Sequence, residues 1–380
     1  MRIKFIIALG IAVLTTLALI AAASAGQVTL TAQEELGKDL FYDTNLSDPP
    51  GQACADCHGP SVGYTGPDLA TNIGGGVYEG AVAGRYGNRK PPAAAYAGDS
   101  PILHFDGMNW IGGMFWDGRA TGSRLGDPLA EQAQGPFLNP LEQNIASPQV
   151  VIDKVLASTY SDLFMQVCTD PLTLYDCIGR AIAAYERSAE VSQYTSKYDY
   201  YLKGQAMLTG QETLGMALFF GKAKCGNCHV PPNFTDFTYD NIGSPRNPLN
   251  PFYYEPEWNP LGEDWVDEGL GAYLKSAGYP ASVYETEMGK HKVPTLRNVD
   301  LRPTHTFIKD YFHNGYFKSL YEVVHFYNTR DVPGAGWPAP EVAANLNTTE
   351  MGNLKLNLGE ERAIVAFLKT LSDGYVPKSK

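Results

Sequence analysis

CADCHGPSVGYTG, residues 54–66, begins with the five-residue pattern C-x-x-C-H. In this pattern the two thiols bond covalently to a haem and the histidine binds the iron from one face. The pattern occurs a second time as CGNCH, residues 225–229. The chain is therefore expected to carry two covalently bound haem c groups. The residues expected to hold them are Cys54, Cys57 and His58 for the first and Cys225, Cys228 and His229 for the second.

The stretches that precede the two motifs repeat each other. LTAQEELGKDLF at 30–41 and LTGQETLGMALF at 208–219 share Leu, Thr, Gln, Glu, Leu, Gly, Leu and Phe at the same offsets. The leucines and phenylalanines fall at helical spacing. A Thr-x-x-Glu capping box stands at the start of each copy, Thr31 with Glu34 and Thr209 with Glu212. Each haem motif is thus predicted to follow a capped amphipathic helix.

An internal repeat of this kind predicts two similar units. We place their boundary within 190–207, after the apolar helix expected at 177–191, so the domains are 26–195 and 196–380. The chain has 39 glycines and 26 prolines, and alternation typical of strands is scarce. The predicted fold is mainly α, with long loops and little β.

The N-terminus has the pattern of a secretory signal peptide. Arg2 and Lys4 precede an apolar run that ends in the small-residue site Ala23-Ser24-Ala25. This predicts cleavage after residue 25 and a periplasmic protein, the alternative being a permanent membrane anchor. Another long apolar run is not found in the sequence, and the net charge of -12 argues against a nucleic-acid partner.

Two cysteines lie outside the haem motifs. Cys168 and Cys177 are expected to form a disulfide, because unpaired cysteines of a secreted protein pair readily in an oxidising compartment. The alternative is two free buried thiols.

Four further segments point to a catalyst rather than a plain electron carrier. Together, in this order, they resemble the bacterial dihaem cytochrome c peroxidase family, which includes MauG and its relatives. The segments are FWDGRA at 115–120, EQAQGPFLNPLE at 131–142, KVPTLRNV at 292–299 and YFHNG at 311–315. The resemblance covers nearly all of the chain beyond the signal peptide. It implies that each half is a cytochrome-c-like helical unit, with a peroxide-reactive haem in the first and an electron-transfer haem in the second.

The resemblance also assigns roles around the first haem. Trp116 would lie between the two haems, and Glu142 would be the acid–base group for peroxide, with Gln132 as its neighbour in the pocket. A carboxylate in a partly desolvated pocket can take a proton and return it. A histidine that closes the iron opposite His58 in many relatives is missing here, so this haem is expected to be open. His104 is the one alternative distal ligand.

Around the second haem the resemblance predicts a tyrosine ligand. Relatives carry a methionine fourteen residues after the histidine of F-H-x-G, and here that position is Tyr327. MauG-like members place a tyrosine there and use it as axial ligand. The alternatives are His325 as ligand, or Tyr327 as a core aromatic beside another open haem. His313 would lie between the haems, and Arg297 would pair with a haem propionate.

One family feature is altered in this sequence. Members usually bind calcium between the domains, through an asparagine of R-N-x-P and carbonyls of a T-x-P segment. Here Lys90 stands at the asparagine position, and Ile308 and Asp310 stand where Thr and Pro would be. Calcium requires oxygen ligands. It is therefore a doubtful cofactor: either the Lys90 amine replaces the ion, or the site is displaced to Asn88.

The resemblance implies an enzyme that reacts with hydrogen peroxide and takes electrons from a protein. We favour a MauG-like enzyme that oxidises a Trp or Tyr side chain on a partner protein. One alternative is a cytochrome c peroxidase supplied by a small cytochrome or copper protein. An alternative of another class is a passive dihaem electron carrier. The aromatic and acidic loop 245–265 is either a partner-facing segment or a cover for the haem edge.

Overall fold

The structure is a computed structural model that describes residues 28–377. The predicted signal peptide, 1–25, lies outside the described residues. From Ala32 onward the chain forms one compact unit, so the division at 195/196 stays a prediction. The helices are α2 (Ala32–Tyr42), α3 (Cys54–Cys57), α4 (Leu69–Ile73), α5 (Pro128–Leu138), α6 (Pro148–Leu156), α7 (Ser161–Val167), α8 (Leu174–Arg187), α9 (Lys197–Leu202), α10 (Gly210–Phe220), α11 (Gly269–Ser276), α12 (Ala281–Tyr284), α13 (Leu320–Thr329) and α14 (Leu358–Lys369).

Strands contribute very little to the described chain. β1 (His104–Phe105) pairs antiparallel with β2 (Trp110–Ile111), and β3 (Tyr239–Asp240) pairs antiparallel with β4 (His291–Lys292). Long irregular segments join the helices, as the many glycines and prolines predict. The expectation of a mainly α fold with long loops is confirmed. Within the described range, none of the helices has the length and apolar character needed to cross a membrane.

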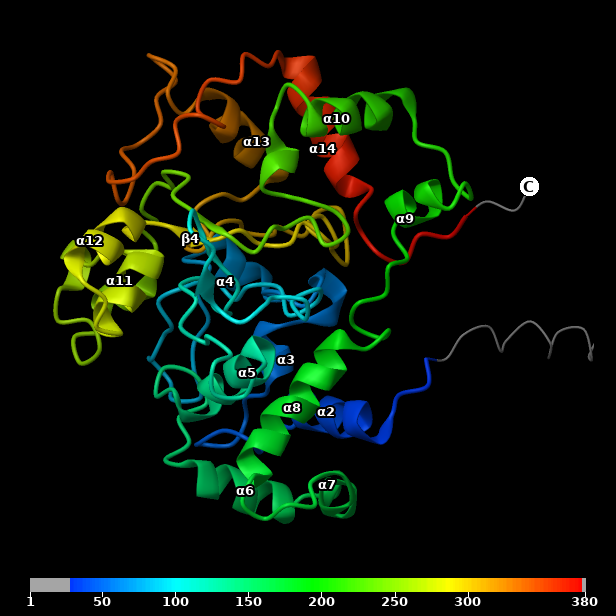
Figure 1. Cartoon of the computed structure of the whole chain (residues 1–380), viewed down its shortest axis with the longest axis vertical. Helices are drawn as coiled ribbons and strands as arrows, with labels where there is room; N and C mark the ends of the chain where they lie inside the picture. The colour runs from blue at the N-terminus through cyan, green and yellow to red at the C-terminus, as the bar shows by residue number, and fades with distance from the viewer. Residues whose placement is uncertain (1–27, 378–380) are drawn as a thin grey trace, which may run out of the picture. The chain divides into compact units, whose positions relative to one another are not determined.

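Two matching helix pairs form the frame of the molecule. α2 packs on α8, and α10 packs on α14 (Figure 1). Both contacts are made at a glycine of the repeated sequence: Gly37 lies against the Ala181 carbonyl, and Gly215 lies against the Ala363 carbonyl. A Cβ atom at either glycine would collide with that carbonyl oxygen. The glycine shared by the two copies therefore allows close helix packing in each half.

The partner helices carry a second repeat that the sequence analysis missed. AIAAYERS at 181–188, at the end of α8, matches AIVAFLKT at 363–370, at the end of α14. The matching positions keep Ala, Ile, a second Ala, an aromatic ring, a basic residue and a hydroxyl. A comparison of the sequence with itself over its full length would have found this repeat.

The helix starts agree with the predicted caps. α10 has Thr209 as N-cap, and the Thr209–Glu212 capping box is confirmed by hydrogen bonds in both directions. α2 begins at Ala32, directly after Thr31. Such a box satisfies backbone N–H groups that would lack partners in the first turn.

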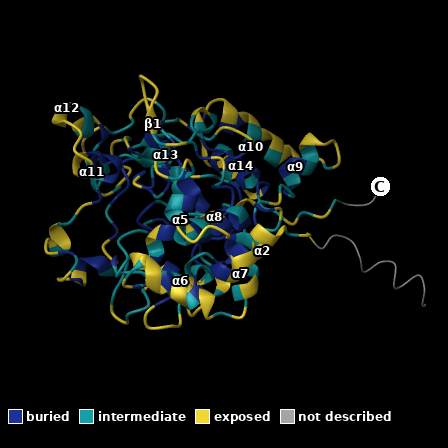
Figure 2. Ribbon diagram, turned by 60° about the horizontal axis from the view of Figure 1, so that its bottom comes forward, coloured by how far each residue is buried: buried dark blue, intermediate teal, exposed yellow. Residues whose placement is uncertain are grey.

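The second half packs around a cluster of aromatic rings. Three phenylalanine rings contact one another, with centroids 5.3 to 6.3 Å apart. They are Phe219 of α10, Phe367 of α14 and Phe234 of the loop after the second haem motif. All three are at most 1% exposed. Figure 2 shows the exposed residues along the outer faces of α2, α6 and α10, with the buried residues inward. This division fixes which face of each helix is turned toward the haem motifs.

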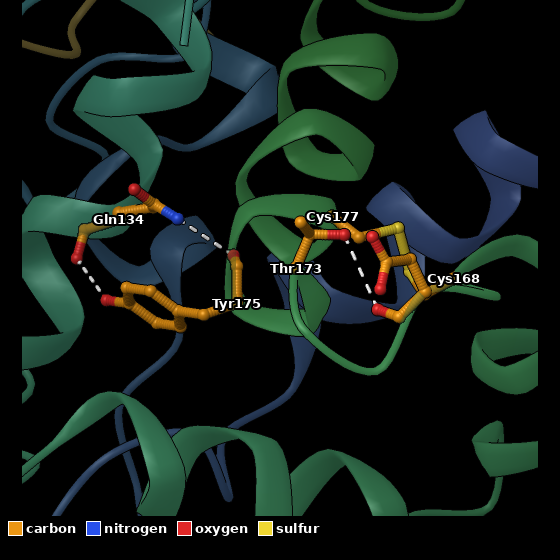
Figure 3. Close-up of a disulfide and its surroundings, with 6 residues drawn as sticks. Gln134, Cys168, Thr173, Tyr175 and Cys177 are labelled. Atoms are coloured by element: carbon orange, nitrogen blue, oxygen red, sulfur yellow. Dashed lines mark hydrogen bonds between the residues drawn. A yellow bond between two sulfur atoms is a disulfide. The ribbon is translucent and has the colours of Figure 1, made fainter. Parts of the chain in front are cut away.

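Cys168 and Cys177 are joined by a disulfide in the structure, with their Cα atoms 5.8 Å apart (Figure 3). The bridge links the end of α7 to the first turn of α8. Beside it, Gln134 of α5 donates to the Tyr175 carbonyl, and the Tyr175 hydroxyl donates back to the Gln134 carbonyl, both at 2.8 Å. These contacts fix α8 against its neighbours α5 and α7.

Candidate haem sites

The first haem motif forms the short helix α3. Cys54 and Cys57 begin and end this helix, and His58 follows directly. The Nδ1 atom of His58 lies 3.1 Å from the Tyr64 carbonyl oxygen. Burial lowers the pKa of His58 to about 4, so its imidazole is neutral. With a proton on Nδ1 directed to the carbonyl, the Nε2 lone pair is left for a metal ion.

The second motif reproduces this arrangement. Cys225 opens a 3-10 turn, Cys228 follows it, and the Nδ1 atom of His229 lies 2.9 Å from the Phe234 carbonyl oxygen. Burial lowers the pKa of His229 as well. Each site thus has two thiols and one imidazole whose Nδ1 atom faces a backbone carbonyl oxygen. These groups fit a covalently attached haem, whose iron would bind the Nε2 atom.

The carbonyl that orients each histidine belongs to a residue with left-handed backbone. The φ angles are 57° at Tyr64 and 56° at Phe234. The threonine that follows each of them closes the loop: Thr65 donates to the Pro91 carbonyl at 2.8 Å, and Thr235 donates to the Val293 carbonyl at 2.6 Å. The loop is thereby tied to a second segment in each half.

A large, mainly apolar cavity surrounds the second motif. Cys225, Cys228 and His229 line it, and Tyr327 of α13 lines the same cavity. Burial, with nearby Asp240 adding to the effect, raises the pKa of the Tyr327 hydroxyl. A bound metal ion would act in the opposite direction, because a cation favours the phenolate.

Met351 also lines this cavity and is only 4% exposed. The prediction from sequence concerned only the position of Tyr327, so Met351 was not among the predicted ligands. Its thioether is a second candidate for the face opposite His229. The Gly352 N–H donates to the Tyr327 carbonyl at 2.6 Å, which places the two candidates next to each other.

The two alternative histidine ligands lie in other surroundings. His104 is exposed on β1, with its Nδ1 atom 2.8 Å from the Ile102 carbonyl oxygen. His325 of α13 is 41% exposed, and its Nδ1 atom lies 2.9 Å from a carboxylate oxygen of Glu361. Both imidazoles therefore already have a partner away from the haem motifs.

Trp116 and His313 meet at the junction of the two halves. Their ring centroids are 6.5 Å apart and their planes are inclined by 69°. The Trp116 indole N–H donates to the Lys90 carbonyl at 2.8 Å, and the Lys90 N–H donates to the His313 carbonyl at 2.7 Å. Both rings also line the cavity of the second motif. The main chain of Lys90 thus binds the Trp116 ring and the main chain of His313, the two residues predicted to lie between the haems.

Glu142 lies close to the first pair of thiols. Its charge contributes to raising the pKa of Cys57. Burial raises the pKa of Glu142, while Arg119 and a hydrogen bond from Asn139 lower it. A carboxyl with a raised pKa can be protonated at one step and ionised at the next. Gln132 is half-buried on α5.

Arg119 is a residue that the sequence analysis overlooked. Its guanidinium lies 3.8 Å from the centre of the Phe115 ring and donates to Asp117 at 2.9 Å. It is a nearby positive charge that acts on Glu142. Its place in the quoted segment FWDGRA was a usable signal, because an arginine beside a catalytic carboxylate sets that group's pKa.

A buried group of charges surrounds His313. The His291 and His313 rings stack with centroids 3.6 Å apart. The His313 Nε2 atom lies 3.4 Å from Glu341 and 3.9 Å from Asp267. Arg89 donates two hydrogen bonds, of 2.6 and 2.7 Å, to the Asp267 carboxylate. This network was not predicted from the sequence, since its members come from segments far apart in the chain.

Arg297 has partners within the protein. Its Nη1 atom lies 2.7 Å from Asp199, and its Nε atom donates to the Pro232 carbonyl at 2.8 Å. The side chain is 1% exposed. Arg297 also lines the cavity of the second motif, and its pairing with a haem propionate stays a prediction.

Comparison with known proteins gives consistent matches. A family described as Di-haem cytochrome c peroxidase matches residues 31–207. Methylamine utilization protein MauG of Paracoccus denitrificans is 35% identical over 364 residues, covering 89% of this chain and 88% of its own. Cytochrome c551 peroxidase of Nitrosomonas europaea is 30% identical over 344 residues, covering 89% and 79%. The crystal structure of the diheme peroxidase BthA from Burkholderia thailandensis matches with a TM-score of 0.76 and 29% identity, covering 92% of this chain and 88% of that chain.

Proposed function

Because the chain belongs to the dihaem cytochrome c peroxidase and MauG family of oxidoreductases, we propose that it is a periplasmic, MauG-like enzyme. It reacts with hydrogen peroxide at the first haem and oxidises a Trp or Tyr side chain of a partner protein. The predicted signal peptide supports the location.

The haem groups supply the redox chemistry, namely cleavage of the peroxide O–O bond and acceptance of electrons from the partner. The protein residues hold these groups in place. Cys54, Cys57 and His58 hold the first haem, and the second motif holds the other in the same way. The first haem is proposed to be open opposite His58.

Glu142 and Gln132 are proposed to serve peroxide at the first haem. The Glu142 carboxylate takes a proton from the bound peroxide and returns it to the oxygen that leaves. Its raised pKa supports this role, because a group that must both accept and donate needs a pKa near the working pH. Gln132 would orient the peroxide by a hydrogen bond.

Trp116 and His313 are proposed to couple the two haems. The Trp116 indole is buried and fixed by its hydrogen bond to Lys90. His313 lies beside it, within reach of Glu341 and Asp267.

The observation that carries the MauG-like assignment is Tyr327, which lines the same cavity as His229. A phenolate ligand is anionic and favours the oxidised state of the second haem, whereas a neutral thioether favours the reduced state. A tyrosine-ligated haem is therefore suited to share an oxidising equivalent rather than to store an electron.

Two alternatives remain to be separated from this proposal. Met351 in the same cavity favours a cytochrome c peroxidase that takes electrons from a small cytochrome or copper protein. A passive dihaem electron carrier would need no acid–base group at Glu142. Mixing the ferric protein with peroxide distinguishes the carrier, because a carrier gives no change in the haem spectrum.

The ligand of the second haem is tested by electron paramagnetic resonance of the resting holoenzyme. We expect one high-spin and one low-spin ferric signal in the wild type. Tyr327→Phe should alter the low-spin signal, and Met351→Leu, the matched control in the same cavity, should leave it unchanged. The reverse result would move the assignment to the peroxidase alternative. Two low-spin signals in the wild type would refute an open first haem.

A further inference from the structure

Three lysine side chains link the first half of the described chain, 28–195, to the second half, 196–377. The Nζ atom of Lys309 donates to the carbonyl oxygens of Val62 at 2.8 Å, Asn298 at 2.9 Å and Leu301 at 3.1 Å. The residue is only 4% exposed. An ammonium group has three N–H donors and a neutral amine has two. Three carbonyl acceptors match the three donors of the charged form, although burial, together with the nearby charges of Lys90 and Arg302, lowers the pKa of Lys309 well below its ordinary value.

Lys318 has the same kind of surroundings. Its Nζ atom donates to the carbonyl oxygens of Asn72 at 2.6 Å, Gly74 at 3.1 Å and Gly315 at 2.7 Å. Two of these carbonyls belong to the first half and one to the second. Each of the two lysines thus binds backbone oxygens of both halves, as a metal ion would.

Lys90 reaches across the junction in the opposite direction. Its Nζ atom donates to the Thr65 hydroxyl at 2.6 Å and the Pro91 carbonyl at 3.1 Å, and lies 3.5 Å from an Asp310 carboxylate oxygen. The side chains of Lys90 and Asp310 are 8% and 2% exposed. Burial raises the pKa of Asp310, and the positive charges of Lys90 and Lys318 act against this effect. The Lys90 ammonium group is therefore the partner that this buried carboxylate has in the other half.

Lys90, Ile308 and Asp310 stand at the positions where the family resemblance implies a calcium ion, and Lys309 lies between the last two in the chain. Calcium takes six to eight oxygen ligands at about 2.3–2.6 Å. Here Lys90 brings an ammonium group, and it points at the one carboxylate of the set. The residues present do not fit a bound calcium.

We infer that the ammonium groups of Lys90, Lys309 and Lys318 close the junction between the two halves, and that the protein neither binds nor requires calcium there. This inference stands apart from the proposed function, because it rests on contacts of the protein alone. It has a consequence for Trp116 and His313. The Lys90 carbonyl accepts from the Trp116 indole and the Lys90 N–H donates to the His313 carbonyl, so the residue that closes the junction contacts both of these residues.

The first experiment measures metal content and stability of the holoenzyme. After desalting from a calcium-containing buffer, elemental analysis should find two iron atoms and no stoichiometric calcium per chain. The melting temperature and the haem spectrum should be the same with EGTA and with added calcium. One tightly bound calcium per chain, or a melting temperature that EGTA lowers and calcium restores, would overturn the inference. Loss of that calcium in Asn88→Ala would show that the site is displaced, and also contradicts it.

The second experiment tests the lysine contact itself. Lys90→Met should lower the melting temperature, and calcium should not restore it, because a buried Asp310 carboxylate is left without its partner. The double variant Lys90→Met, Asp310→Asn should recover most of the loss. Restoration of Lys90→Met by calcium would contradict the inference, and so would a double variant that melts as low as the single one. Failure of Lys90→Met to fold leaves the wild-type metal analysis as the deciding measurement.

Discussion

Trp116 and His313 occupy matching places in the two halves of the molecule. Each follows a phenylalanine with left-handed backbone, at φ 63° for Phe115 and 70° for Phe312. The Trp116 carbonyl accepts from the Lys292 N–H at 2.8 Å, and the His313 carbonyl accepts from the Lys90 N–H at 2.7 Å. The backbone conformation and the backbone hydrogen bond are alike at the two positions. The side chain differs, being an indole at Trp116 and an imidazole at His313.

Lys90 and Lys292, which donate these two backbone hydrogen bonds, also differ in what surrounds their side chains. Lys90 has the Asp310 carboxylate beside its ammonium group. Lys292 has the carbonyls of Gly112 and Phe237 at 3.0 and 3.3 Å, and burial lowers its pKa to about 7. The backbone hydrogen bonds at these matching positions are therefore the same, and the side chains differ. Substitutions at matching positions are therefore the way to test the difference.

The largest effect is expected at the acid–base group. Glu142→Gln should slow the reaction of the ferric enzyme with peroxide by about 10²- to 10⁴-fold, the usual contribution of such a group. Glu350→Gln is the matched control, because Glu350 lies beside Cys228 of the second motif as Glu142 lies near Cys57 of the first. It should leave the rate unchanged. The measurement is the stopped-flow change of the haem spectrum.

If Glu142→Gln and Glu350→Gln slow the reaction equally, the proposed difference between the two sites is wrong. A rate for Glu142→Gln within a few-fold of wild type would assign the proton transfer to another group. Glu186, which lies near Cys54, would be the next candidate.

Much of this frame follows from the sequence. The C-x-x-C-H motifs, the repeated helix before each and the disulfide cysteines are local patterns, and the helices α2 and α10 are where the repeat predicts them. Tyr327 was located through the family resemblance, which counts fourteen residues from His313, and it lines the same cavity as His229. The other features depend on neighbouring residues or on an internal repeat, so one chain is enough to find them.

The remaining features depend on contacts between distant segments. Lys309 binds the carbonyl of Val62, and Lys318 binds the carbonyl of Asn72, each more than 200 residues away. Backbone carbonyls are present at every residue, so no residue type marks the partner. Met351 was missed for a related reason, because its loop returns to the cavity by a path that spacing does not reveal.

The pH dependence of stability tests another difference between the two halves, at Glu186. By the second repeat it matches Leu368, so one half buries a carboxyl where the other buries an apolar chain. Glu186 is 4% exposed, and burial raises its pKa from 4.5 to about 8. The folded state then binds the proton more tightly than the unfolded state. Its contribution is fully present below pH 4.5 and is lost as the pH rises to about 8.

We therefore expect the free energy of unfolding to fall between pH 5 and pH 8, by as much as about 4 kcal/mol from this group alone. Glu186→Gln should remove this part of the decrease and be the more stable protein at pH 8. Glu360→Gln, on the exposed face of α14, is the control and should leave the slope unchanged, because the pKa of Glu360 is lowered. Denaturant unfolding at several pH values measures both. A slope that persists in Glu186→Gln would place the buried proton elsewhere.

The smallest effect is expected on stability, at the glycine contact that both helix pairs share. Gly37→Ala and Gly215→Ala each place a Cβ atom against a carbonyl oxygen, that of Ala181 or of Ala363. Overpacking of this kind costs about 1–3 kcal/mol. The two variants should lose similar stability in denaturant unfolding, because the same contact is broken in each half. Gly210→Ala, at the open start of α10, should be neutral or stabilising, since alanine favours a helix and its Cβ meets nothing within 4 Å. Unequal losses at Gly37 and Gly215 would show that the halves differ in their backbone packing as well as in their side chains.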